Sequence, residues 1–139
     1  MLVLEIFDSP VPFTFVPSEG EDHHYVAKFD VNGKSYTAQI YTDDEMGFEN
    51  WIIEFDLKGK THLTGTGGEI AVFATVYKIL EKFVTKVEPE SFSFSSTDHE
   101  PSRVKLYTRM ANNLSKKFGY ELKIENDGVD ETHFQFTSS

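Results

Sequence analysis

The stretch "HLTGTGGEIAVFATVYKILEKF", from His62 to Phe83, decides the fold because a cluster of glycines leads directly into a long segment with helical periodicity. From Phe73 onward, apolar residues recur at the i, i+3, i+4, i+7 spacing that places them on one face of a helix. Pro89 ends this pattern, because proline has no N–H to donate and its ring clashes with the preceding helical turn. The sequence therefore predicts a long amphipathic helix that begins at a glycine-rich loop.

The residues before this loop are predicted to form strands, because apolar side chains recur at every second position from residue 24 to residue 57. Asn32 and Gly33 form the dipeptide that is most typical of a tight hairpin turn between two strands. The residues expected on the apolar face of the three strands are Tyr25, Ala27, Phe29, Val31, Tyr36, Ala38, Ile40, Trp51, Ile53, Phe55 and Leu57. We therefore expect three successive antiparallel strands.

The residues after this helix show strand-like alternation and helical periodicity in turn. The segment "SFSFSS", residues 91–96, predicts a short strand with Phe92 and Phe94 on one face. A second amphipathic helix is expected over Pro101–Phe118, with Gly119 as its left-handed cap. The segments "YELKIEND" and "THFQFTSS" are then expected to close the chain as a pair of strands.

Residues 1–20 are rich in proline and are expected to form an extended N-terminal segment. The run "LVLEIF" is a candidate strand, whereas "SPVPFTFVP" contains three prolines. Proline cannot donate to a strand ladder, so this part is expected at the edge of a sheet or in an extended loop.

The order of these elements predicts an α+β fold. After the N-terminal segment it reads strand, strand, strand, helix, strand, helix, strand, strand, with a mostly antiparallel central sheet of six or seven strands. The 139 residues are enough for one domain with a substantial core, so we expect a single domain over residues 1–139.

The composition argues against several classes of protein. A formal net charge of −10 is unsuited to binding nucleic acid, and the acidic residues cluster near predicted turns, where solvated loops are a simpler explanation than mimicry of DNA. The absence of cysteine excludes disulfides and thiolate chemistry and indicates an intracellular protein. No apolar run approaches the ~18 residues of a membrane span, and the N-terminus lacks the features of a secretory signal. The five histidines include no i, i+4 pair, so no metal site is predicted.

From the strand at residue 24 onward, this order of elements resembles the GCN5-related N-acetyltransferase (GNAT) family. In that family an Arg/Gln-x-x-Gly-x-Gly/Ala loop before the helix holds the pyrophosphate of acetyl-coenzyme A. "HLTGTG" places Gly65 and Gly67 in the matching positions, with His62 where the family has Arg or Gln. Glycines let main-chain amides approach an anion that the helix N-terminus also attracts.

The resemblance therefore implies acetyl-coenzyme A as a ligand. The residues expected to bind it are His62, Gly65, Thr66, Gly67, Gly68 and, through a phosphate, Arg103. A purely structural explanation of the same loop stays open, because Thr66 and Glu69 have the spacing of a capping box that satisfies the first amides of a helix.

Two further residues receive catalytic roles from the resemblance. "SRVKLYTRM" resembles the second signature helix of the family, which implies that Tyr107 protonates the departing thiolate of the coenzyme. A carboxylate on the strand before the glycine loop often serves as general base, and Glu54 or Asp56 could deprotonate the acceptor amine. The alternatives are a core tyrosine at 107 and solvated strand carboxylates.

The segments "TGTGGEIAVFATVYKILEKF" and "EPSRVKLYTRMANNLSKKFGY" also resemble short proteins of tailed bacteriophages. That resemblance implies a place in the cytoplasm of an infected bacterial host or in a virion. The two early helices of the GNAT family have no counterpart in the sequence. Two functions follow: an acyl-coenzyme A-dependent N-acetyltransferase acting on an amine, or a non-catalytic phage protein, either a virion component or an inhibitor that binds a host protein. The sequence leaves open whether the chain is an enzyme.

Overall fold

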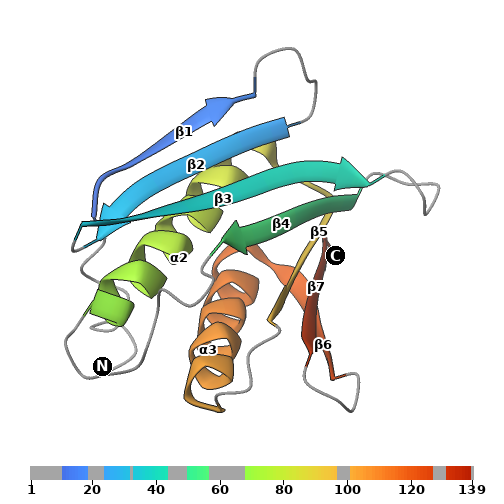
Figure 1. Ribbon diagram of the computed structural model, residues 1–139. Helices are drawn as coiled ribbons and strands as arrows, with labels where there is room; N and C mark the ends of the chain where they lie inside the picture. The colour runs from blue at the N-terminus through green and yellow to red at the C-terminus, as the bar shows by residue number, and fades with distance from the viewer. Residues whose placement is uncertain are drawn as a thin grey trace.

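The computed structural model describes residues 11–18, 24–31, 33–43, 50–56, 68–96, 101–126 and 131–138. These residues form a seven-stranded sheet and two helices (Figure 1). The strands are β1 (Phe13–Pro17), β2 (His24–Val31), β3 (Lys34–Asp43), β4 (Asn50–Asp56), β5 (Ser91–Ser96), β6 (Tyr120–Asn126) and β7 (Thr132–Ser138). The helices are α2 (Gly68–Val87) and α3 (Pro101–Phe118). The predicted α+β class and order of elements are confirmed.

The strands lie in the order β1-β2-β3-β4-β5-β7-β6. All neighbouring strands are antiparallel except β4 and β5, which are parallel and are connected through α2. β1 lies at one edge of the sheet, as the prolines of that segment predict. The candidate strand at residues 2–7 lies outside the described residues.

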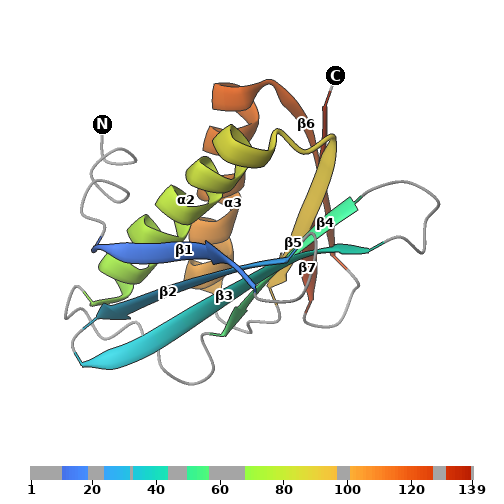
Figure 2. The ribbon, with the colours of Figure 1, turned by 90° about the horizontal axis from the view of Figure 1, so that it is seen from above.

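Both helices pack on the same side of the sheet (Figure 2). The core therefore contains one face of each strand together with the apolar stripes of α2 and α3. The largest fully buried side chains are Phe73, Phe83, Phe92, Phe94, Phe134, Phe136, Ile40, Ile79, Leu80, Met110, Leu114 and Val72. The opposite face of the sheet, here called the open face, is covered by no helix in the part of the chain that the structure describes. Within that part, no helix is long and apolar enough to span a membrane.

Each helix ends at a residue with left-handed backbone geometry. Gly119 follows α3 with φ of 76°, which confirms the predicted cap. Glu88 follows α2 with φ of 51°, and its N–H donates to the carbonyl of Val84 at 2.9 Å. A side chain in this conformation is strained, because Cβ comes close to the following carbonyl oxygen.

We therefore expect Glu88→Gly to raise the free energy of unfolding by about 1 kcal/mol, since glycine adopts positive φ without that strain. Gly119→Ala is the matched opposite change. An added Cβ at Gly119 meets nothing within 4 Å, so its cost of about 1 kcal/mol should come from the backbone alone. Urea denaturation of the two variants should shift the midpoint in opposite directions. Equal midpoints for Glu88→Gly and the unaltered protein would contradict this explanation.

Candidate functional site

The sheet opens between the carboxyl ends of its two parallel strands. Among the described residues, β4 and β5 pair only at Trp51 with Phe92, Ile52 with Ser93 and Ile53 with Phe94. Beyond these positions β4 stays paired with β3 as far as Asp56, and β5 stays paired with β7 as far as Ser96. Figure 1 shows the two strands diverging toward their carboxyl ends.

We call this opening the split; its two sides are Glu54–Asp56 of β4 and Ser95–Ser96 of β5. The main-chain groups that the two strands present toward each other there are not used in a ladder between β4 and β5. In sheets with parallel strands, ligands bind outside the carboxyl ends of the strands. The split is therefore the candidate site.

Aromatic rings pack beneath the split on the side of the helices. The ring of Phe55, from β4, contacts that of Phe94, from β5, edge to face at a centroid distance of 6.0 Å. Tyr107 of α3 lies behind Phe94 at 6.0 Å and packs edge to face on Phe73 at 5.0 Å. Tyr107 is 6% exposed, so its ring belongs to the core. The predicted catalytic tyrosine thus lies one ring away from the split.

Glu54 lies on the open face at the edge of the split. It alternates along β4 with the buried Trp51 and Ile53, as predicted, and its side chain is exposed. The hydroxyl of Tyr41, from β3, donates a hydrogen bond to Oε1 of Glu54. This bond holds the carboxylate at one side of the split. The side chain of Asp56 is not among those described.

Ser95 forms the other side of the split on the same face, and His133 lies next to it on the following strand, β7. Ser95 Oγ lies 2.5 Å from Nδ1 of His133, which comes from the neighbouring strand β7. The two residues are opposite each other in the β5–β7 register, and both are partly buried. A continuation of the β4–β5 register would bring Ser95 level with Glu54.

No motif in the sequence indicates this pair, because His133 is isolated from the other histidines along the chain. Alternation along the two strands could have placed Ser95 and His133 on their polar faces. What it could not give was the register between two strands that are nearly forty positions apart. Within the described chain, no cluster of His, Asp and Glu side chains is suited to holding a metal ion.

The predicted phosphate-binding residues fall mostly outside the described residues. His62, Gly65, Thr66 and Gly67 lie in the undescribed stretch 57–67, and Gly68 is the first residue of α2. Arg103 lies in the first turn of α3, and its side chain is also outside the described part. The placement of Gly68 puts the N-terminal end of α2 directly after the glycine cluster, as expected.

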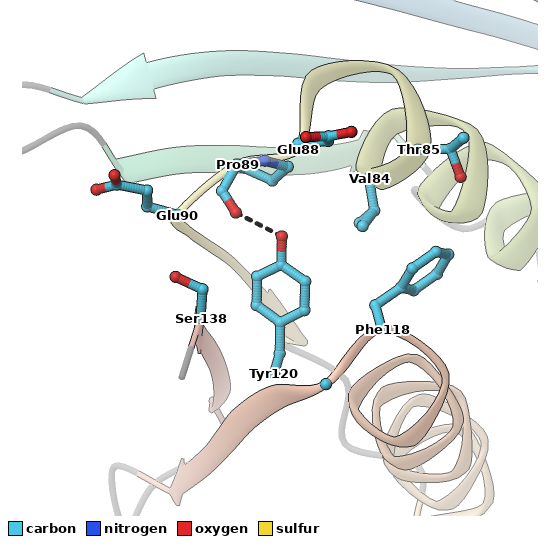
Figure 3. A pocket seen from close by; sticks show the side chains of 9 residues that line it. Val84, Thr85, Glu88, Pro89, Glu90, Phe118, Tyr120 and Ser138 are labelled. Carbon is cyan, nitrogen blue, oxygen red and sulfur yellow. Dashed lines mark hydrogen bonds between the residues drawn. The ribbon is translucent and has the colours of Figure 1, made fainter.

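A separate hollow of about 690 Å³ lies where α2 and α3 end and β5 and β6 begin (Figure 3). Tyr120 stands at its centre, and its hydroxyl donates to the carbonyl oxygen of Pro89. Burial raises the pKa of Tyr120, and the carboxylate of Glu88 raises it further. Glu88, Glu90 and two helix C-termini make this hollow electronegative, so it is unsuited to the phosphates of a coenzyme.

Comparison with known proteins supports the fold. Neither a protein-family model nor a curated protein matches the chain. Among solved structures, the fold is similar to that of an acetyltransferase of the GNAT family from Streptococcus pneumoniae, with a TM-score of 0.50 and 12% sequence identity. The match covers 85% of this chain and 68% of that chain. The predicted GNAT-like fold is thereby confirmed, and at this identity the likeness concerns the fold alone.

Proposed function

We propose that this protein is an acyl-coenzyme A-dependent N-acetyltransferase whose coenzyme enters the split. The observation that carries the proposal is the opening of the sheet at the carboxyl ends of β4 and β5. Main-chain N–H and C=O groups along the open edges can hydrogen-bond an extended polar chain, as a further strand would. The GNAT-like fold is consistent with that ligand.

The residues present fit such a ligand at both ends. The N-terminal end of α2 carries the partial positive charge that attracts phosphate, and it begins at Gly68. The partly buried ring of Phe55, which packs on the buried ring of Phe94, gives the split an apolar side that would exclude water from a thioester. When bound, the coenzyme would supply an acyl group activated as a thioester.

The chain's own residues then have separable roles. Glu54, positioned by Tyr41, would attract the cationic amine of the acceptor on the open face. Tyr107, behind Phe94, is the group that we propose to protonate the sulfur that leaves. These two residues approach the split from opposite faces of the sheet.

Calorimetric titration with acetyl-coenzyme A tests the proposal. We expect saturable binding, and we expect Gly67→Glu to weaken it by about tenfold or more, because like charges placed together cost several kcal/mol. Thr85→Glu is the matched control, since it adds the same charge at an exposed position near the other end of α2. Its affinity should equal that of the unaltered protein. The absence of heat and of a thermal shift at millimolar coenzyme would rule out the enzyme.

The second candidate is a non-catalytic phage protein that binds a virion or host protein. The observation that favours it is the open face, which no helix covers in the described chain and which presents polar side chains from several neighbouring strands. Affinity capture from an infected bacterial cytoplasm, or analysis of purified virions, should then recover a partner in a stoichiometric ratio. Coenzyme binding without such a partner would favour the acetyltransferase.

A further inference from the structure

The Ser95–His133 pair has no role in the mechanism described above, although it lies at the edge of the proposed site. It faces the same side of the sheet as Glu54, across the split. The amine that Glu54 attracts would therefore meet an imidazole on the opposite side. This arrangement joins residues from β4, β5 and β7, which only the fold brings together.

We infer that His133 is the proton acceptor for the acceptor amine, that Ser95 positions its ring, and that Glu54 holds the amine while it is still cationic. This inference rests on the proposed function. A carboxylate and an imidazole on the two sides suit an ammonium group that must lose a proton before it attacks.

The hydrogen bond to Ser95 bears directly on this role. A neutral imidazole carries one proton, and the nitrogen without it is the base. If Nδ1–H donates to Ser95 Oγ, then Nε2 has the lone pair and can accept a proton. Within the described chain Nε2 has no hydrogen-bond partner. The ring is therefore positioned through Nδ1, and Nε2 is available to accept a proton.

Histidine is also better suited to this step than an exposed carboxylate. General-base catalysis is most efficient when the base exchanges protons near the working pH, and imidazole is the side chain that commonly does so. Glu125 lies opposite His133 on β6 and forms an ion pair with Lys123 at 3.5 Å. Glu131 precedes β7, and Glu54 lies across the split.

The chemical step balances as follows. One proton of the ammonium passes to Nε2 of His133 and from there to water. The amine nitrogen then forms a bond to the acyl carbon, and the carbon–sulfur bond breaks with its electron pair on sulfur. The nitrogen loses a second proton as the amide forms, and the departing thiolate takes up one proton. The products are the N-acyl amine and the free thiol, with one proton released.

His133→Gln tests the inference, since glutamine keeps a polar side chain but accepts no proton. We expect its affinity for acetyl-coenzyme A to stay within about twofold of the unaltered protein, while turnover falls by about 10²–10⁴-fold. Turnover is measured as release of free thiol with spermidine, butylamine and a lysine-containing peptide. His24→Gln makes the same change on β2 of the open face, and it should leave turnover unchanged. Added imidazole should partly restore His133→Ala.

Nitrogen NMR of the His133 ring gives a second readout that needs no coenzyme. We expect a proton on Nδ1 at neutral pH, and loss of that preference in Ser95→Ala. A proton on Nε2 instead, full turnover of His133→Gln with an unchanged pH profile, or acylation of Ser95 itself would each overturn the inference while leaving coenzyme binding intact. An unaltered protein that binds no coenzyme overturns the proposed function, and the inference with it.

Discussion

Phe94→Ala is expected to lower the free energy of unfolding by about 3–5 kcal/mol, the usual cost of removing a fully buried aromatic ring. Phe94 is 1% exposed and lies at the centre of a ring cluster. Its centroid is 4.9 Å from that of Phe134 and 5.8 Å from that of Phe136, besides its contacts with Phe55 and Tyr107. A cavity here would leave rings from β4, β7 and α3 without a common neighbour, and it should appear as a lower urea midpoint.

Phe55→Ala is the matched control, because it removes the other phenylalanine ring of the Phe55–Phe94 contact. The ring of Phe55 is only partly buried. We expect it to cost only roughly 1–2 kcal/mol, since less apolar surface returns to water. If the two variants lost equal stability, Phe94 would not be the centre of the core at the split. If Phe55→Ala weakened coenzyme binding with little loss of stability, the apolar side of the proposed site would gain direct support.

Stability is also expected to fall steeply in alkali because of Tyr77. Burial raises the pKa of this tyrosine from 10.0 to about 12, and the charge of Glu81 one helical turn later contributes to the shift. Between these two values the unfolded chain loses the phenolic proton and the folded chain keeps it. The folded state then binds more protons than the unfolded state, so its stability decreases as pH rises.

The stabilising contribution of Tyr77 is fully present below pH 10 and is lost by about pH 12. Its loss should amount to about 2 kcal/mol, after an allowance for partial contact of the ring edge with solvent. Tyr77→Phe should flatten the decline without abolishing it, because burial raises the pKa of Tyr36 and Tyr120 as well. Urea denaturation at several pH values checks this. Parallel declines for both proteins would show that Tyr77 is not responsible.

The fold was predictable because the hydrophobic periodicity of each segment and the glycine and proline residues at its ends indicate the same elements. Gly119 stands where a left-handed cap is needed, and it does have φ of 76°. Pro89 follows the last turn of α2, which ends at Val87. Glu88 is different, because a glutamate in the sequence gives no sign of the positive φ of 51° that it adopts. The sequence could not predict that strain.

The candidate site was predictable only in part. Alternation along β4 assigned Glu54 to the polar face, and helical periodicity assigned Tyr107 to the apolar stripe, and both placements hold. The catalytic roles of Glu54 and Tyr107 stay predictions. The Tyr41–Glu54 and Ser95–His133 contacts depend on strand register, which arises from the pairing of distant segments and not from any local pattern.

The short pairing between β4 and β5 also has a consequence for dynamics. α2 packs mainly on the first strands of the sheet and α3 on the last two, so the chain consists of two helix-and-sheet halves. Only three paired positions of β4 and β5 join their main chains within the described residues. The two halves are therefore expected to separate most readily along the short pairing of β4 and β5. A ligand bound between β4 and β5 would hold the two halves together, so it would slow amide hydrogen exchange in both of them.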